Sequence, residues 1–174
     1  VLNEYGGRSN LFAGSSAGHS TVTGLSNTGF GGGGVLLSVT SGSSNTAIGN
    51  AALQTISSGA NNTAVGVNAL ANLSVSGNNT AVGYQAGLAL FGGSAGSSNI
   101  FLGYNTASSS TYTPAATSNT FIAGSDTAAI SDIYFGNGIK YTSPTAYTIR
   151  GSGGSGTNIA GSNINIAGGI GTGT

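Results

Sequence analysis

Asn79-Thr80-Ala81-Val82-Gly83-Tyr84-Gln85-Ala86-Gly87 is a stretch that this chain rewrites several times, and the repetition decides the fold. In the clearest repeats, Val or Ile lies three residues after the Asn and Gly lies four residues after it. The clear repeats span residues 45–53, 62–70 and 79–87, and looser ones span residues 10–14, 27–31, 99–105 and 119–124. Successive Asn residues are separated by 17, 18, 17, 17, 20 and 20 positions. A sustained period of this kind is typical of stacked-repeat proteins.

Each Thr-Ala-Val-Gly or Thr-Ala-Ile-Gly segment predicts a short β-strand. Such strands are too short to be stable alone, so they need paired strands above and below them. Gly at the corners permits the backbone angles of tight turns. A coil of 17 residues accommodates two short strands and two turns, and rises by about 4.7 Å, the spacing of paired strands. The sequence therefore predicts an all-β fold, a parallel β-roll or β-solenoid of about seven coils of 17–20 residues.

Two other structures compete with the solenoid. A helix is disfavoured because each interior Gly costs about 1 kcal/mol relative to Ala and no helical apolar stripe is present. A disordered Gly/Ser-type linker matches the composition, with 33 Gly residues. Linkers, however, lack the positional order that Asn and Gly show here.

The repeats divide the chain into three parts. Residues 1–43 form an irregular N-terminal segment with degenerate repeats, in which residues 35–39 are a strand candidate. Residues 44–130 form the β-roll repeat region. Residues 131–174 are richer in Gly and alternate Ile with polar residues, which predicts a second β segment of different cross-section.

Charge is nearly absent, which excludes several classes of function. Only 3% of the residues are charged and the net charge is zero, against about 25% charged residues in ordinary domains. A nucleic-acid-binding face needs basic residues that this chain lacks. No apolar run reaches the roughly 20 residues of a membrane helix. We therefore expect neither nucleic-acid binding nor membrane insertion.

In-register stacking explains why charges are rare. Equivalent positions of successive coils lie on top of one another, so like charges would repel, whereas Asn side chains can form hydrogen-bonded ladders. The alternative is that each Asn caps its own turn locally, and both roles can hold together. The predicted ladder consists of Asn45, Asn62, Asn79, Asn99 and Asn119.

The sequence offers little for catalysis, and we predict no catalytic, cofactor-binding or metal site. The carboxylates are Glu4, Asp126 and Asp132, and only the last two are near in sequence. The single imidazole, His19, has no Cys to assist it, although copies of it gathered about a symmetry axis could hold a metal ion. No Gly-rich stretch ends in the Lys-Ser/Thr of a phosphate loop.

Apolar residues favour self-association. Five of the Phe residues, Phe12, Phe30, Phe91, Phe101 and Phe121, exceed what a thin roll is expected to bury. Pairing rolls about a symmetry axis would cover one face and protect open strand edges, whereas the alternative is a monomeric roll.

Three tyrosines are candidate surface contacts. Aromatic rings stack on sugars and on protein surfaces, and Tyr84, Tyr104 and Tyr112 lie within or near the repeats. The alternative is that these rings pack between chains.

Residues 10–124, with their Asn-Thr-Ala-Val-Gly-Tyr-Gln-Ala-Gly style of repeat, resemble the head repeats of trimeric autotransporter adhesins of the YadA type. Those repeats build a left-handed parallel β-roll in a homotrimer. The repeats are followed by Tyr147-Thr148-Ile149-Arg150-Gly151-Ser152-Gly153-Gly154-Ser155-Gly156-Thr157-Asn158-Ile159-Ala160-Gly161. This combination is similar to bacteriophage tail fibres, where such a tract precedes an intramolecular chaperone domain of the endosialidase type. No coiled-coil stalk or chaperone domain lies within the 174 residues, so the homotrimer is implied by the resemblance alone.

The resemblance implies a non-enzymatic structural and adhesive segment of a phage tail fibre, located in the virion and directed toward a host surface receptor or glycan. An alternative is a bacterial cell-surface adhesin or a self-assembling extracellular filament. A third hypothesis is a glycan-cleaving tailspike, which needs a pair of carboxylates in a groove that this sequence hardly supplies.

Overall fold

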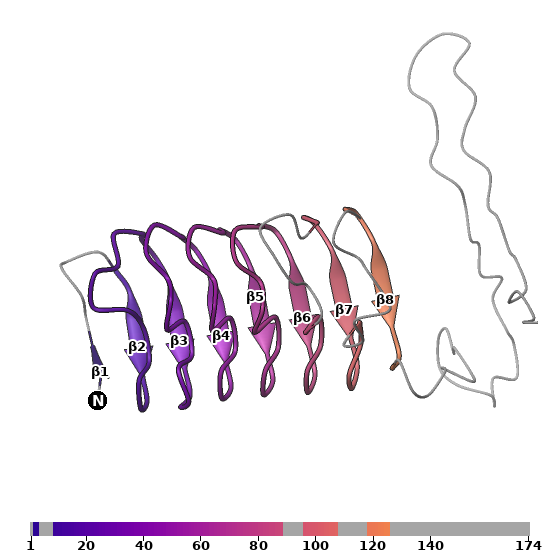
Figure 1. The fold of residues 1–174 in the computed structure, drawn as a ribbon, viewed down its shortest axis with the longest axis horizontal. Coiled ribbons are helices and arrows are strands. Elements are labelled where there is room, and N and C mark those ends of the chain that lie inside the picture. Colours follow the sequence, from indigo (N-terminus) through magenta and orange to yellow (C-terminus); the bar gives the residue numbers. More distant parts are fainter. Residues whose placement is uncertain (1, 4–8, 89–95, 108–117, 126–174) are drawn as a thin grey trace, which may run out of the picture. The chain divides into compact units, whose positions relative to one another are not determined.

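The computed structural model describes residues 2–3, 9–88, 96–107 and 118–125. In these residues the chain is an all-β parallel solenoid of about five turns, without any helix. Figure 1 shows its short strands side by side in chain order. The strands are β1 (Leu2–Asn3), β2 (Leu11–Ala13), β3 (Thr28–Phe30), β4 (Thr46–Ile48), β5 (Thr63–Val65), β6 (Thr80–Val82), β7 (Ile100–Leu102) and β8 (Phe121–Ala123). The prediction of an all-β parallel solenoid is confirmed.

Strands β2 to β8 pair in parallel, and from β2 to β7 the pairing keeps the register of the sequence repeat. Thr46 of β4 lies beside Thr63 of β5, which lies beside Thr80 of β6. Each coil is thus the crossover that joins one parallel strand to the next. β2 and β3 belong to the same ladder, although their repeats are degenerate. At the N-terminal edge, β1 pairs antiparallel with β2.

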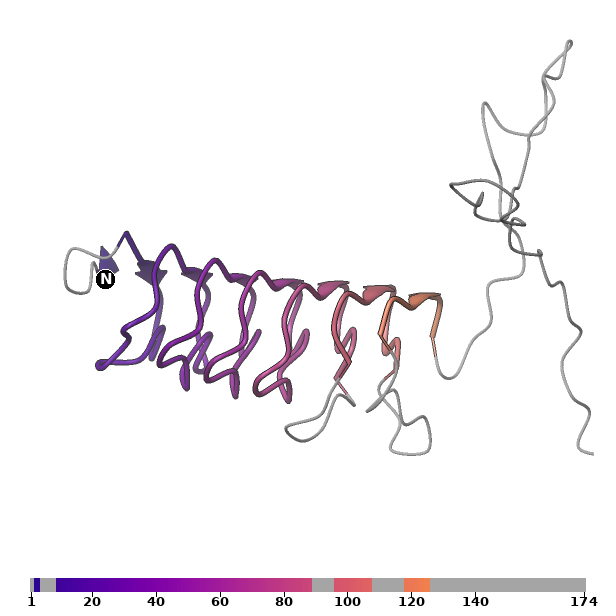
Figure 2. The ribbon, with the colours of Figure 1, turned by 90° about the horizontal axis from the view of Figure 1, so that it is seen from above.

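Within the described residues each coil contains one strand of three residues, so the predicted second strand per coil is wrong. The return path is a series of turns that still bond to the next coil, as when the N–H of Leu53 donates to the carbonyl of Ala69 (3.0 Å). Left-handed residues interrupt the extended backbone there, including Ala51 (φ 54°) and Leu53 (φ 49°). Residues 35–39 are such a return path, because Leu36 has φ 51°, and they are not a strand. Figure 2 shows these return paths side by side below the strands.

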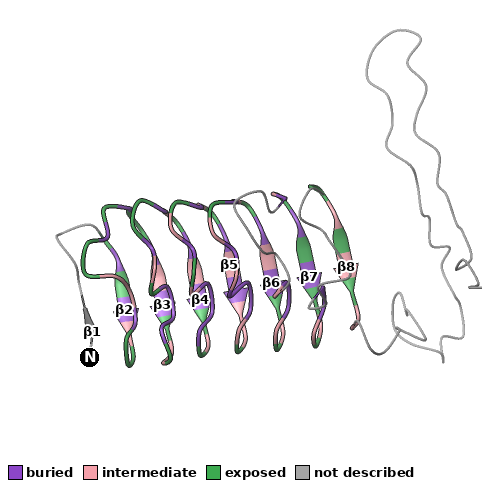
Figure 3. Ribbon diagram, viewed as in Figure 1, coloured by how far each residue is buried: buried purple, intermediate pink, exposed green. Residues whose placement is uncertain are grey.

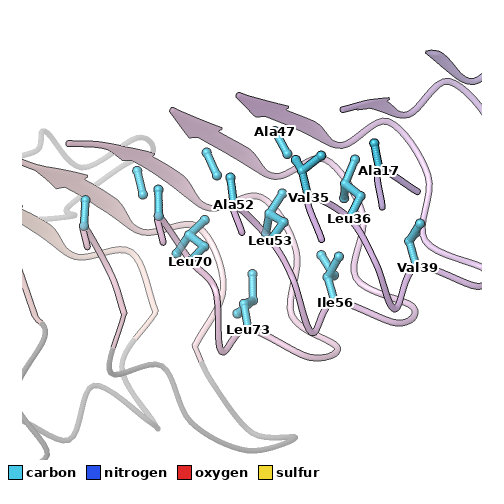
Figure 4. Close-up of a cluster of buried hydrophobic side chains, with 14 of the residues drawn as sticks. Ala17, Val35, Leu36, Val39, Ala47, Ala52, Leu53, Ile56, Leu70 and Leu73 are labelled. Carbon is cyan, nitrogen blue, oxygen red and sulfur yellow. The ribbon is translucent and has the colours of Figure 1, made fainter. Parts of the chain in front are cut away.

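The interior is built from columns of equivalent residues, one from each coil. The strand centres Ala47, Ala64 and Ala81 are fully buried and small. The return path supplies the bulk that fills the space opposite them, in two columns seen in Figure 4. The first column is Leu36, Leu53 and Leu70, and the second is Val22, Val39, Ile56 and Leu73.

Large and small residues exchange places between coils. Where the strand centre is Phe12, a Cβ on Gly18 of the same coil would collide with the ring. Near the buried ring of Phe101, a Cβ on Gly87 would approach the ring to 3.1 Å. Where the strand centre is Ala64, the return path carries Leu70 instead. The narrow cross-section therefore has room for about one large side chain in each coil, either at the strand centre or on the return path across from it.

Exchanging the sizes in one coil tests this packing rule. Ala64→Phe alone should lower the free energy of unfolding by about 1–3 kcal/mol or more, because the ring overpacks the site. Adding Leu70→Gly, which imitates the Phe12 and Gly18 pair, should recover part of that loss. The measurement is a double-mutant cycle by chemical denaturation. Purely additive losses from the two substitutions would contradict the packing rule.

Some sequence predictions lie outside the described residues. These are the second β segment at residues 131–174 and the surface contact at Tyr112.

Candidate interaction surface

The outward side of the ladder is apolar. In a three-residue strand the centre points inward, so the first and third residues point outward. We call the outward-facing first and third residues of β3 to β8 the sheet face, and Figure 3 shows their exposure. Its large exposed members and their exposed fractions are Phe30 (57%), Ile48 (44%), Val82 (41%), Ile100 (43%), Leu102 (38%) and Phe121 (64%). Between the two ends of this face lie the half-buried threonines of β3 to β6.

This arrangement inverts the usual distribution of size, because Ile48 and Val82 are exposed while Ala47 and Ala81 are buried. Burying a Val or Ile side chain stabilises a protein by about 1.5–3 kcal/mol. A regular column of exposed Val and Ile side chains therefore indicates a site of interaction. These residues are not among the site residues predicted from the sequence. Their recurrence at the position before the corner Gly was the available signal.

The Phe residues divide between the core and the surface. Phe12 and Phe101 are completely buried, so the roll buries two of the five Phe residues that together exceed what a thin roll is expected to bury. They fit because a Gly lies beside each ring: Gly18 beside Phe12, and Gly87 of the preceding coil beside Phe101. Phe30 and Phe121 remain exposed on the sheet face, and Phe91 lies outside the described residues.

A column of buried Asn side chains runs along the solenoid beside the strands. The backbone N–H of Asn62 donates to Oδ1 of Asn45 (3.0 Å), and the N–H of Asn79 donates to Oδ1 of Asn62 (2.9 Å). The same link joins Asn99 to Asn79 (3.1 Å). The Nδ2 groups of Asn45, Asn62 and Asn79 add further bonds, such as Asn45 Nδ2 to the carbonyl of Gly59 (2.8 Å).

The Asn side chains combine the two roles that the sequence left open. Their Oδ1 atoms link successive coils, while Asn79 Nδ2 also donates to the carbonyl of Gly77 two residues earlier (3.2 Å). The column extends toward the N-terminus through Asn27 and Asn10, which bond in the same way. All six Asn residues of the column are at most 2% exposed.

Asn119 does not belong to this column, which corrects the predicted ladder. The residue that bonds to Oδ1 of Asn99 is Thr120, through its backbone N–H (3.0 Å). Asn119 is exposed and left-handed (φ 62°), as is Ser98, which precedes Asn99. The Gly that pairs with Gly103 is Gly124, five residues after Asn119 instead of four. The backbone stack of glycines sets the register, and it places Thr120 at the Asn position.

Two of the three candidate tyrosines are brought together. The rings of Tyr84 and Tyr104 stack with centroids 5.3 Å apart and an interplanar angle of 13°. They follow the corner glycines of adjacent coils, and they are 44% and 59% exposed. Stacking along the solenoid covers one side of each ring, so these tyrosines form a ridge at the corner beside the sheet face.

The described residues assemble no group of three side chains that could hold a metal ion. His19 accepts a hydrogen bond at Nδ1 from the backbone N–H of Thr21 (3.2 Å), and its Nδ1 lies 2.8 Å from the Thr21 hydroxyl. The six charged residues, Glu4, Arg8, Asp126, Asp132, Lys140 and Arg150, all lie outside the described ranges. The described part of the solenoid is therefore without formal charge.

Comparisons with protein-family models, with curated proteins and with solved structures find no match for this chain. Among the residues that the structure describes, none belong to a helix with the length and apolar character needed to cross a bilayer. The surface described above is thus interpreted from its own chemistry.

Proposed function

We propose that this protein is a non-enzymatic structural and adhesive fibre segment: a solenoid of seven coils in a homotrimeric phage tail fibre that projects toward the host cell. In this proposal the protein resides in the virion and contacts a host surface receptor or glycan. The observation that carries the proposal is the sheet face, a regular apolar surface on a stack of uncharged coils.

The stacked coils suit a structural element of a fibre. Nearly every coil repeats the same hydrogen bonds to its neighbours, so the stack forms a rod whose length is set by the number of repeats. An extended apolar surface on a water-exposed rod marks a site of association, since monomeric proteins rarely expose such contiguous patches. The adhesive part of the proposal rests on the exposed ridge of Tyr84 and Tyr104, whose hydroxyls and ring edges suit a polar, hydroxylated ligand.

The proposal is tested by the subunit number and by cell binding of the purified chain. Sedimentation equilibrium should give a mass three times that of the chain, and the labelled protein should remain on the surface of some members of a panel of bacteria. Tyr104→Ala should reduce that retention about tenfold, since loss of a central aromatic contact typically costs 1–2 kcal/mol or more. A monomer that is retained on none of the bacteria would refute the proposal.

A cell-surface adhesin or extracellular filament is the competing form of the same proposal. The two differ in the rest of the gene: the adhesin requires a secretion signal and a membrane anchor, whereas the fibre requires a virion-attachment domain and a chaperone domain. A tailspike would release reducing sugar ends from host polysaccharide, and we expect the purified protein to release none.

A further inference from the structure

Exposed apolar residues occur both on and off the sheet face, and their distribution differs. Away from the ladder, Leu25, Leu37 and Val75 are exposed singly on return paths, and Val67 occupies the position equivalent to the exposed Tyr84 and Tyr104 after the corner glycines. On the sheet face, exposed apolar residues recur at equivalent positions of neighbouring strands, from Phe30 to Leu102. Single exposed residues are ordinary, whereas a repeated column calls for a partner.

We propose that the sheet face is the contact between copies of this chain, which pack side by side, parallel and in register. This inference rests on the proposed homotrimer and adds which surface the copies share and how they align. The partner is another copy because the face repeats at the spacing of paired strands, about 4.7 Å. A second copy has the same coil spacing, so each coil of one copy can make the same contacts with a coil of the other.

The absence of charge also favours a second copy. The described residues carry no formal charge, so the face offers nothing to a charged ligand and suffers no repulsion from its own twin. The core of a protein interface is likewise depleted of charged residues. The half-buried threonines Thr46, Thr63 and Thr80 lie among the apolar side chains and allow close approach at the middle coils.

The two ends of the face determine the alignment. Phe30 lies on β3, in the column of third residues, and Phe121 lies on β8, in the column of first residues. Parallel, in-register packing places each large ring beside its equivalent in the neighbouring copy. A slip by one coil would set Phe30 against Ile48 and would leave an unpaired coil at each end.

The first experiment compares two variants, one with a Lys on the sheet face and one with a Lys on a return path. Val82→Lys lies on the sheet face (41% exposed), and Val75→Lys lies on a return path with nearly the same exposure (43%). Val82→Lys should raise the concentration at which the oligomer dissociates by more than about tenfold, because it buries unpaired ammonium groups. Val75→Lys should leave dissociation unchanged. Far-UV circular dichroism checks that both variants fold, since neither changes a buried position.

A second experiment tests how the copies are aligned along the sheet face, without adding a charge to it. The chain has no Cys, so a single introduced Cys reports one position. Thr28→Cys and Ile100→Cys occupy the same column, on β3 and β7, near opposite ends of the face. Under mild oxidation each variant should cross-link to itself, since a disulfide requires Cα atoms within about 7 Å. Val75→Cys should not cross-link.

The outcomes separate this inference from the proposed function. An oligomer that survives Val82→Lys, with no cross-link from Thr28→Cys, would overturn the sheet face as the contact and leave the fibre proposal standing. Cross-links that appear only when the Thr28→Cys and Ile100→Cys proteins are mixed would overturn the parallel alignment. A wild-type chain that sediments as a monomer would overturn both.

Discussion

Gly66→Ala is expected to lower the free energy of unfolding by about 3–5 kcal/mol. Gly66 has φ 136°, a conformation that residues with a Cβ rarely adopt. An added Cβ would also collide with the carbonyl oxygen of Gly83 and come within 2.6 Å of its carbonyl carbon. Both obstacles belong to the backbone, so no side chain can rotate away to relieve them.

The coil spacing cannot expand to accept the methyl group. The N–H of Gly66 donates to the carbonyl of Ile48 in the preceding coil (2.8 Å), and the N–H of Gly83 donates to that of Val65 (2.8 Å). Relieving the collision would lengthen these bonds on either side of the substitution. The same crowding recurs at Gly49 and Gly103, so the corner column is a region of close backbone contact between coils.

Gly32→Ala is the matched control for Gly66→Ala. Gly32 follows a corner glycine, but the nearest heavy atom to an added Cβ is Asn50 Nδ2 at 4.0 Å. Its substitution should change stability by less than about 0.5 kcal/mol. The comparison is made by denaturant unfolding followed by far-UV circular dichroism. Equal losses for the two variants would show that the corner stack does not set the coil spacing.

The second large effect is expected at Asn62. Asn62→Leu keeps a similar volume but removes the side-chain bonds to Asn45 Oδ1 (3.1 Å), to the carbonyl of Ser76 (2.9 Å) and to Asn79. The N–H of Asn79 and the carbonyl of Ser76 then lose these partners in the buried interior. An unsatisfied buried group costs about 1–3 kcal/mol, so the total loss should be about 3–5 kcal/mol.

Asn61→Ser is the control for the ladder variant, and hydrogen exchange is the direct readout. Asn61 is exposed and left-handed (φ 59°), and Ser44 and Ser98 already occupy the equivalent position in other coils. This substitution should cost about 1 kcal/mol or less. In Asn62→Leu the amide of Asn79 should exchange faster than the strand amides around it. Unchanged protection of that amide would mean that the Asn column does not hold the coils together.

The strand positions could be predicted from the sequence, whereas the place of Asn119 could not be predicted from the spacing of the Asn residues. The position of the strands follows from the spacing of Asn and Gly, since the strand lies between them in every coil from β2 to β7. The error at Asn119 arose because the last repeat contains one more residue between Asn and Gly. Counting back four residues from Gly124 would have placed Thr120 in the column. The glycine position is the safer reference because no other residue fits there. The bond to Oδ1 of the preceding Asn needs only a backbone N–H, which any residue except Pro can supply.

The single strand per coil was not predictable from local preference. Residues 51–55 contain Ala, Leu and Thr without a turn signal, yet Ala51 and Leu53 are left-handed. That conformation costs about 1–2 kcal/mol for a residue with a Cβ. It persists because it lets Leu53 point into the core while its N–H bonds to the next coil, and both gains depend on neighbouring coils.

The amino-acid sequence by itself determined the period, the parallel stacking, the placement of Asn and Gly, and the lack of charge, because each is a property of residue spacing. Only the tertiary structure decided which side of each strand faces the core. A three-residue strand offers two faces, and bulk alone would have buried Ile48 and Val82. In the middle coils, Leu53 and Leu70 from the far side of the coil occupy the narrow interior, so the small strand centres Ala47 and Ala64 fit beneath the sheet and the larger Ile48 is left outside.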